Sequence, residues 1–330
     1  MSDGVTTRAV RLVAAGEPPP RAVEDVRLPA PADGEVLVRV DYAGVNPIDT
    51  YAAAGIVGDT ARLPRTIGVE GTGIVEGAAE GAGLVDGARV VVTGSGLGLL
   101  RDGTWAGGLV APREAAVEVP RELDPTQAGA IGTAAVTAHE ALHVLGRITA
   151  DDRVLVLGAG GGVGVVAVQL ARIAGASVVG QVGSAAKADA VAALGADRVV
   201  VTGAGDLVAE VGDFRPTLVI DPLGGGFTPA AVELAAISGR IVILGVSAGQ
   251  DIPFPGRTFY RKGLSLLGYA GLVSTPERRA AAVRAVAADI IAGRLRIPVD
   301  EVVPLGRFDD AIARLRDRSV FGKVVLATQQ

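Results

Sequence analysis

The centre of the chain contains a predicted strand, a glycine-rich turn and a predicted helix in immediate succession. Residues 154–157 form a short apolar run of the kind found in strands that are covered on both faces. Five glycines follow within residues 158–164. Apolar residues then recur over 163–174 with helical spacing. This succession favours an α/β fold built on a parallel sheet.

The same turn offers a site for the pyrophosphate of a dinucleotide. Its glycines let the backbone approach the phosphates, and the helix N-terminus presents free N–H groups and the positive end of the helix dipole. The strict G-x-G-x-x-G pattern starting at Gly158 fails because its sixth position is Val163. The register that begins at Ala159 fits, with Gly161 and Gly164 in the later glycine positions. We therefore predict a dinucleotide site at this turn.

The end of the next predicted strand distinguishes between the two nicotinamide cofactors. Sites for NAD usually place Asp or Glu there, where it accepts a hydrogen bond from the ribose 2′-hydroxyl. Residues 180–184 read GQVGS, and Lys187 follows shortly after. No carboxylate would repel a 2′-phosphate, while the hydroxyl of Ser184 and the ammonium of Lys187 could bind one. We predict NADPH, the alternative being that Lys187 is only a solvated residue of a first helical turn.

Length and composition narrow the class of protein. A chain of 330 residues is long for one domain and suits two. Its formal net charge of −5 argues against a nucleic-acid or anionic-membrane partner. No uninterrupted apolar stretch is long enough to span a bilayer, and the N-terminus lacks the pattern of a signal segment. Without cysteine there is no disulfide, thiolate nucleophile or Cys-ligated zinc. We expect a cytoplasmic protein that acts on a small molecule.

Two regions of the chain differ in their predicted secondary structure. Residues 8 to about 120 contain two segments that alternate apolar and polar residues, at 7–13 and 35–41, and we expect further short strands at 73–76 and 87–92. Short strands at this spacing favour a partly open β-barrel. From about Asp124, predicted helices alternate with buried strands, the pattern of a doubly wound parallel sheet. Here we expect strands at 154–157, 177–182, 198–201, 217–220, 241–244 and 264–267, and helices near 126–146, 163–174, 185–194, 227–237 and 276–293. A helix at 308–316 and a strand at 323–326 should return to the barrel.

Several motifs together resemble one family. They are YAGVNPIDTY at 42–51, IGVEGTGIV at 67–75, GTAAVTAHEAL at 132–142, the glycine turn, and FGKVVL at 321–326. The chain resembles the zinc-free, zeta-crystallin-like quinone oxidoreductases of the medium-chain dehydrogenase/reductase superfamily over nearly its full length. Residues 92–98 and 275–279 also look like the acrylyl-CoA reductase branch. The resemblance implies a GroES-like β-barrel domain, a Rossmann domain, and often a homodimer built through the Rossmann sheets. The domains would be a catalytic barrel over 1–123, an NADPH-binding domain over 124–294, and a return to the catalytic domain over 295–330.

The resemblance also implies roles for individual residues. Those that match cofactor-binding positions are Asn46 and Thr133 beside the nicotinamide ribose, Gly161, Gly162 and Val163 at the pyrophosphate, Ser184, Lys187 and Arg318 at phosphates, and Gly245, Val246, Ser247, Phe321 and Gly322 at the nicotinamide end. Two positions depart from the family. Thr202 stands in place of a tyrosine of the 2′-phosphate pocket, and Val57 in place of a second active-site tyrosine. Because of these two departures, the substrate of a family member cannot be assigned to this chain by analogy.

The residues that are missing favour reduction without a metal. Zinc alcohol dehydrogenases of this superfamily stabilise an alkoxide through a metal usually held by Cys, His and a carboxylate. The only histidines here, His139 and His143, lie outside the predicted barrel. Hydride delivery to a quinone or a conjugated C=C bond needs little beyond positioning and a donor to the developing oxyanion. Tyr51 is the candidate donor, with Asn46 and Thr133 orienting; alternatively, Tyr51 lines the barrel wall and solvent supplies the proton.

Three other functions are alternatives to a metal-free reductase. His139 and His143 fit the H-E-x-x-H pattern of zinc proteases, but no third histidine exists and no Glu follows before Glu210. An enoyl-thioester reductase would need a basic patch for the carrier phosphate, which the sequence does not show. A non-catalytic NADPH-binding protein would bind the cofactor without turnover. The leading prediction is a zinc-independent, NADPH-dependent reductase of quinones or α,β-unsaturated carbonyls.

Overall fold

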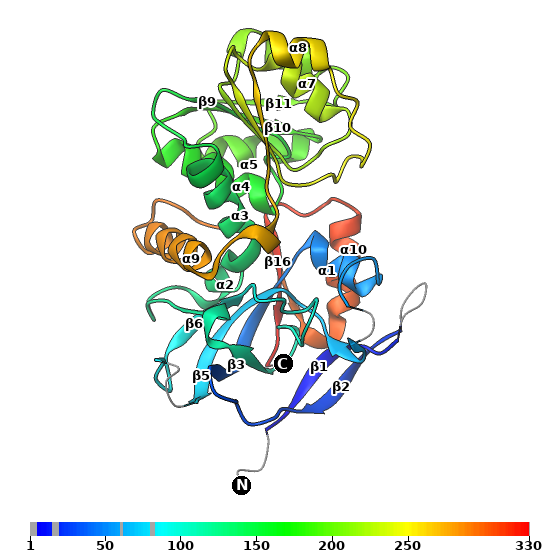
Figure 1. Cartoon of the computed structure of the whole chain (residues 1–330), viewed down its shortest axis with the longest axis vertical. Helices are drawn as coiled ribbons and strands as arrows, with labels where there is room; N and C mark the ends of the chain where they lie inside the picture. The colour runs from blue at the N-terminus through cyan, green and yellow to red at the C-terminus, as the bar shows by residue number, and fades with distance from the viewer. Residues whose placement is uncertain (1–4, 15–19, 60–61, 80–82, 330) are drawn as a thin grey trace. The chain divides into compact units, whose positions relative to one another are not determined.

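The structure is a computed structural model that describes residues 5–14, 20–59, 62–79 and 83–329 (Figure 1). Contacts divide the chain into two compact units. The first comprises Met1–Val136, Thr275–Gly293 and Ile297–Gln330, and the second comprises Thr137–Ser274 and Arg294–Arg296. The first unit thus includes residues 124–136 and 275–293, which the predicted boundaries assign to the NADPH-binding domain, because these segments pack against its strands.

Two β-sheets form the framework of the first unit. Their strands are β1 Thr6–Leu12, β2 Arg21–Arg27, β3 Glu35–Val45, β4 Arg65–Thr66, β5 Glu70–Ala78, β6 Arg89–Thr93, β7 Gly108–Pro112, β8 Ala116–Glu118, β15 Val299–Pro304 and β16 Lys323–Ala327. The larger sheet has the order β15-β16-β3-β5-β6-β8, with β7 paired to β3, and the smaller sheet has the order β2-β1-β4. Pairing is antiparallel except between β15 and β16. The strand predicted at 323–326 pairs with β3, as the sequence led us to expect.

Alternation along β3 builds the core around which this sheet forms. Val36, Val38 and Val40 are fully buried and pack with apolar residues of β5, β6 and β7. A second apolar core contains Trp105 and Phe308, whose ring centroids lie 6.3 Å apart. The two cores fix the carboxyl end of β3 firmly, and this end leads directly into the candidate site.

The helices of the first unit belong to separate segments of the chain. They are α1 Pro47–Ala53, α2 Pro125–Ala128, α9 Pro276–Ile291 and α10 Phe308–Arg316. The single helix expected over 126–146 is instead α2, a π-helical segment Ile131–Ala135, α3 Val136–His139 and a second π-helical segment Glu140–Leu145. Gly132 lies within the first π-helical segment, where a Cβ would lie 2.9 Å from the Cβ atoms of both Glu70 and Thr93. The chain widens where it presses against β5 and β6.

A parallel sheet with helices between its strands forms the second unit. Its strands are β9 Arg153–Val156, β10 Ser177–Val182, β11 Arg198–Val201, β12 Leu218–Asp221, β13 Arg240–Ile243 and β14 Ser265–Gly268. Its helices include α4 Gly162–Ile173, α5 Ala188–Ala193, α6 Leu207–Val211, α7 Phe227–Leu234 and α8 Gly256–Arg261. The strand order is β11-β10-β9-β12-β13-β14. The chain adds β10 and β11 on one side of β9 and then crosses to the other side of β9 to add β12, with all strands parallel. This confirms the predicted doubly wound sheet, and such a crossing marks the crevice where ligands bind.

Within the described ranges, no helix combines the length and the apolar character that crossing a membrane requires. The longest of the helices named above is α9, with 16 residues, and it carries several arginines. Its N-terminus is capped by Thr275, whose side chain accepts a hydrogen bond from the Arg278 N–H.

Candidate active site

The glycine turn brings the start of α4 close to the end of β9. Gly158 adopts a φ of 60°, which favours glycine, and turns the chain after the strand. A Cβ at Gly164 would lie 2.3 Å from the Gly158 carbonyl oxygen, so only glycine lets the helix pack this close to the turn. Gly161 is the extended N-cap residue, and α4 begins at Gly162. The register predicted from Ala159, Gly161 and Gly164 therefore has a steric basis.

The N-terminus of α4 fits a bound anion. Its first turn carries no acidic residue, and no side chain in the described part of the protein caps it. The first N–H groups of a helix lack partners within the helix and carry the positive end of its dipole. Gly161 is exposed, and Gly162 and Val163 are half-buried, so their backbone is reachable. These features fit the pyrophosphate of a dinucleotide.

A neutral side chain occupies the end of β10, where an NAD site would usually carry a carboxylate. Gln181 is buried, its Oε1 accepts a hydrogen bond from Gly158 N at 2.9 Å, and its Nε2 donates to the Thr202 carbonyl oxygen at 2.6 Å. The residue thus connects the glycine turn to the end of β11. The missing carboxylate is visible in the sequence, whereas these two hydrogen bonds of Gln181 are visible only in the structure.

Ser184 and Lys187 lie in the loop that follows β10. Ser184 is exposed, and its Oγ accepts a hydrogen bond from Ala186 N at 3.3 Å. Lys187 is half-buried at the end of the short 3₁₀ turn Ala185–Lys187. Thr202, in the position of the family's tyrosine, is buried and donates its backbone N–H to the Val182 carbonyl at 3.0 Å. A hydroxyl and an ammonium are therefore close in sequence beside the neutral end of β10.

The predicted residues Gly245, Val246 and Ser247 follow the carboxyl end of β13. Ser247 Oγ donates to the Pro222 carbonyl oxygen at 3.1 Å, and a Cβ at Gly245 would lie 2.7 Å from the same oxygen. The loop after β13 therefore packs against the loop after β12. Val246 is exposed at 39%. All predicted residues of the second unit lie in the loops that follow carboxyl ends of parallel strands or in the first helical turn after such a loop, at the edge where ligands bind in such sheets.

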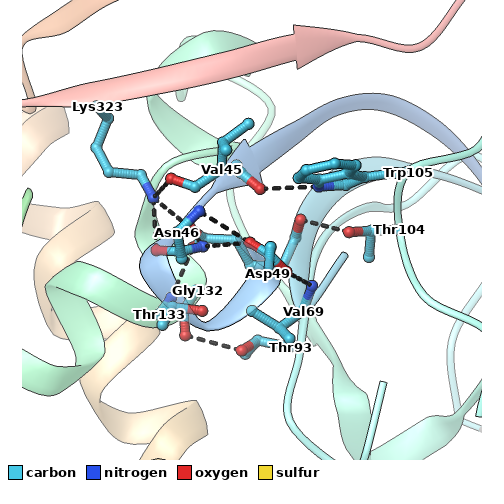
Figure 2. Close-up of polar contacts among 12 residues, drawn as sticks. Val45, Asn46, Asp49, Val69, Thr93, Thr104, Trp105, Gly132, Thr133 and Lys323 are labelled. Carbon is cyan, nitrogen blue, oxygen red and sulfur yellow. Dashed lines mark hydrogen bonds and ion pairs between the residues drawn. The ribbon is translucent and has the colours of Figure 1, made fainter. Parts of the chain in front are cut away.

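The first unit contains a buried polar cluster where β3, β5 and β16 meet (Figure 2). We call Asn46, Asp49, Glu70 and Lys323 the polar cluster. Their exposures are 3% for Asn46 and Lys323 and 0% for Asp49 and Glu70. The pairing of Val324 with Val45 brings Lys323 beside Asn46. Of these four, only Asn46 was named as a site residue from the sequence.

Glu70 connects three separate segments of the chain. Its Oε1 accepts hydrogen bonds from Asn46 Nδ2 and Lys323 Nζ, each at 2.7 Å. Its Oε2 accepts the backbone N–H of Thr133 at 2.6 Å. A Cβ at Gly44 would lie 2.3 Å from Glu70 Oε1, so glycine at that position makes room for the carboxylate. Two residues predicted to contact the nicotinamide ribose are therefore held by one buried carboxylate.

Lys323 completes the electrostatic balance of the polar cluster. Its Nζ donates to Glu70 Oε1 and to Asn46 Oδ1, both at 2.7 Å, and to the Val45 carbonyl oxygen at 3.0 Å. All three ammonium hydrogens are thus engaged. A buried ion pair is stable only when its remaining polar atoms are hydrogen-bonded, and this pair meets that condition.

Asp49 is the second carboxylate of the polar cluster. Its Oδ2 accepts from Asn46 N at 2.8 Å and from Asn46 Nδ2 at 3.3 Å, and its Oδ1 accepts from Val69 N at 3.0 Å. Burial raises the pKa of the Asp49 carboxyl from 3.8 to about 7, although these hydrogen bonds and the charge of Lys323 favour the ionised form. This group therefore titrates near neutral pH.

The hydrogen bonds restrict what Asn46 can do chemically. Both hydrogens of its amide are used, toward Glu70 and Asp49, and its Oδ1 accepts from Lys323. A second lone pair on Oδ1 is the capacity that remains. The Asn46 side chain can accept a hydrogen bond from a hydroxyl, and it cannot donate one to a substrate carbonyl.

The other predicted residues of the first unit range from exposed to buried. Tyr51 is on α1 and is 41% exposed, and Thr133 is half-buried. Arg318 is exposed, in a left-handed conformation after α10. Phe321 is half-buried, with its N–H donated to Asp300 Oδ1 at 3.3 Å. Gly322 is buried, and a Cβ there would lie 2.2 Å from the Pro298 carbonyl oxygen.

The H-E-x-x-H segment does not form a metal site in this structure. The rings of His139 and His143 lie 4.7 Å apart between centroids, on a stretch that enters a π-helix. Glu140 is buried and accepts a hydrogen bond from Ser274 Oγ. Across the described residues, no three or more His, Cys, Asp or Glu side chains are grouped so that they could hold a metal ion. The zinc-protease alternative therefore has no structural support.

Comparison with known proteins agrees with this architecture. The alcohol dehydrogenase GroES-like domain family matches residues 32–121, and the zinc-binding dehydrogenase family matches residues 162–288. The quinone oxidoreductase of Sus scrofa is 32% identical over 324 residues, covering 96% of this chain and 97% of the relative. Both predicted domain types, GroES-like and Rossmann, are confirmed.

Solved structures give the same result. The crystal structure of AibC has a TM-score of 0.87 and 27% identity, covering 99% of this chain and 96% of that one. The structure of mycobacterial Rv1454c complexed with NADPH also has a TM-score of 0.87, with 26% identity, covering 97% of this chain and 99% of that one. Both resemblances extend over nearly the whole length of each chain.

Proposed function

Because this chain belongs to the quinone oxidoreductase branch of the medium-chain dehydrogenase/reductase superfamily, we propose that it is a zinc-independent, NADPH-dependent reductase of quinones or α,β-unsaturated carbonyls. That it is an oxidoreductase follows from the family. The observation that carries the cofactor assignment is the neutral Gln181 at the end of β10, followed by the hydroxyl of Ser184 and the amine of Lys187. The NADPH complex of the mycobacterial neighbour supports the same choice.

The polar cluster supports chemistry without zinc. Oxygen atoms of Glu70 and Asn46 converge there at 2.7 Å from the Lys323 ammonium. A second cation in contact with the same oxygens would be repelled by that ammonium. The chain also has no cysteine, the most common soft ligand for zinc in this superfamily's alcohol dehydrogenases.

The residues of the chain then have distinct tasks in the proposed reaction. Bound NADPH supplies the hydride. The N-terminus of α4 holds the pyrophosphate, and Ser184 and Lys187 hold the 2′-phosphate. Asn46 accepts a hydrogen bond from a ribose hydroxyl, since its amide hydrogens are already used. Tyr51, which is 41% exposed, donates a hydrogen bond and then a proton to the oxygen that gains negative charge.

We also propose that the protein forms a homodimer through the edge of its parallel sheet. β14 ends the strand order on one side and therefore presents backbone groups that a second copy could pair with. Leu266 on this strand is 38% exposed, and Leu272 and Val273, which follow it, are 82% and 64% exposed. Apolar side chains beside an open strand edge favour burial against another chain.

Oxidation of the reduced cofactor in the presence of a set of acceptors tests the proposed reaction. The set contains an ortho-quinone, a para-quinone, simple enones and enoyl-CoA thioesters, each assayed with NADPH and with NADH. Turnover of quinones or enones with NADPH preferred is the expected result. Turnover of the thioesters alone would identify an enoyl-thioester reductase. Tight NADPH binding with no turnover of any acceptor would refute the reductase and indicate a binding protein.

A further inference from the structure

One carboxylate and one ammonium hold both groups that the proposed function places beside the nicotinamide ribose. Glu70 binds the side chain of Asn46 through Oε1 and the backbone of Thr133 through Oε2. Lys323 binds the other end of the Asn46 amide. Neither Glu70 nor Lys323 is accessible to a ligand, since they are 0% and 3% exposed. Any effect they have on the cofactor must act through Asn46 and Thr133.

We propose that Glu70 and Lys323 are positioning residues that orient Asn46 and Thr133 toward the nicotinamide half of the cofactor. This inference rests on the proposed function, which supplies the cofactor. It assigns the two charged residues no contact with substrate or cofactor.

The charges around Asn46 allow one orientation of its amide. Nδ2 faces two carboxylates, at 2.7 Å from Glu70 and 3.3 Å from Asp49, while Oδ1 faces the Lys323 ammonium at 2.7 Å. Turning the amide by half a rotation would place its N–H groups against the ammonium and its oxygen against the carboxylates. Both contacts would become repulsive in a buried site. The ion pair therefore keeps Asn46 as an acceptor.

Packing prevents Glu70 from adapting if its partners change. A Cβ at Gly44 would lie 2.3 Å from its Oε1, and a Cβ at Gly132 would lie 2.9 Å from its Cβ and 3.2 Å from its Oε2. Backbone thus encloses the carboxylate on both sides. Because Thr133 N is 2.6 Å from Oε2, the start of the π-helical segment is held in register with Asn46. The two groups keep a fixed separation as long as the carboxylate is intact.

The test compares two ligands that differ in the nicotinamide half. NADPH and 2′,5′-ADP share the adenosine 2′-phosphate, and only NADPH carries the nicotinamide ribose. Dissociation constants are measured by fluorescence or calorimetry for the wild type, Lys323→Met and Glu70→Gln. The amide introduced by Glu70→Gln offers one acceptor oxygen where the native carboxylate uses two. We expect both variants to bind NADPH about tenfold more weakly, which is the size of effect expected for one lost hydrogen bond. Their dissociation constants for 2′,5′-ADP should equal that of the wild type.

Two controls separate positioning from general damage. Arg11→Met removes a different ion pair of the first unit, with Asp102 at 2.6 Å, and should leave the ratio of the two dissociation constants unchanged. In an Asn46→Ala background, Lys323→Met should change that ratio less than it does in the wild type, because the predicted ribose contact that Lys323 binds directly is gone. If Lys323→Met does not fold, Lys323→Arg keeps the charge but has a planar head that cannot make the same three bonds, and should change the ratio in the same direction.

Each outcome of this test either supports or overturns the positioning role of Glu70 and Lys323. Equal weakening of both ligands, or no weakening of either, overturns the positioning role and leaves Glu70 and Lys323 as structural residues. A full effect of Lys323→Met in the Asn46→Ala background also overturns it. Failure of the wild type to bind either ligand would instead overturn the proposed cofactor, and would be visible before any variant is made.

Discussion

Replacing Asp49 with asparagine should change how the stability of the protein depends on pH. Asp49 is fully buried, and burial raises its pKa from 3.8 to about 7. Between these two values the folded state holds a proton that the unfolded state has released, so the free energy of unfolding falls as the pH rises. The contribution of Asp49 to stability is complete below pH 3.8 and is lost as the pH rises through about 7.

The size of this effect follows from the two pKa values. Each pKa unit corresponds to about 1.36 kcal/mol, and the values 3.8 and about 7 differ by about three units. The wild type should therefore lose about 4 kcal/mol relative to Asp49→Asn between about pH 4 and pH 8. In Asp49→Asn an NH₂ group replaces one of the two carboxylate oxygens. This NH₂ group faces the backbone N–H of either Asn46 or Val69 and cannot accept its hydrogen bond. The free-energy cost of this lost hydrogen bond does not depend on pH. It therefore changes the difference in unfolding free energy between the two proteins by the same amount at every pH.

Urea unfolding at a series of pH values measures this difference directly. Other titrating groups are common to both proteins and cancel when the two free energies are subtracted. Asp213→Asn is a suitable control, because it makes the same substitution at a side chain that is fully exposed. A difference between wild type and Asp49→Asn that stays constant from pH 4 to pH 8, to within about 1 kcal/mol, would refute the raised pKa.

Four further substitutions test other parts of the structure. Lys187→Ala should raise the KM for NADPH about tenfold and leave the KM for NADH unchanged in steady-state assays. Gly164→Ala places a Cβ 2.3 Å from the Gly158 carbonyl oxygen and should destabilise the protein by about 1–3 kcal/mol in urea unfolding. Tyr51→Phe should lower kcat about a hundredfold at saturating NADPH, whereas an unchanged kcat would assign the proton to solvent. Leu266→Lys on the edge strand should shift the sedimentation mass from dimer toward monomer.

Local patterns predicted the parallel sheet well, since each of its strands is a short apolar run between turns. The strands expected at 177–182 and 198–201 match β10 and β11, and the helix expected at 308–316 matches α10. These elements depend on residues close in sequence. The helix expected over 126–146 is helical over most of its length but is divided into α- and π-helical segments. The first π-helical segment contacts distant strands, with Gly132 against Glu70 and Thr93, and no local periodicity records such contacts.

The polar cluster could not be assembled from the sequence, although each member lies in a motif that was recognised. Glu70 and Lys323 are 253 residues apart and meet because β3 pairs with β5 on one side and with β16 on the other. The register of those pairings places Lys323 beside Asn46 and Glu70 beside Gly44. Sequence patterns indicate strands but do not fix which strands pair, or in what register. A charged residue that opens an otherwise apolar strand was the available signal for Lys323, whereas the strand that Glu70 opens also contains Thr72 and Glu76.

Gln181 shows how one position can serve the fold and the cofactor together. A carboxylate in its place could still accept from Gly158 N, but it would face the Thr202 carbonyl oxygen with no hydrogen to donate. Two acceptors in contact inside a buried site repel each other. The amide therefore braces the glycine turn against the end of β11, and the same choice removes the negative charge that would oppose a 2′-phosphate. The preference for NADPH that we propose is then tied to the stability of the turn, because the side chain that fixes the turn must be neutral.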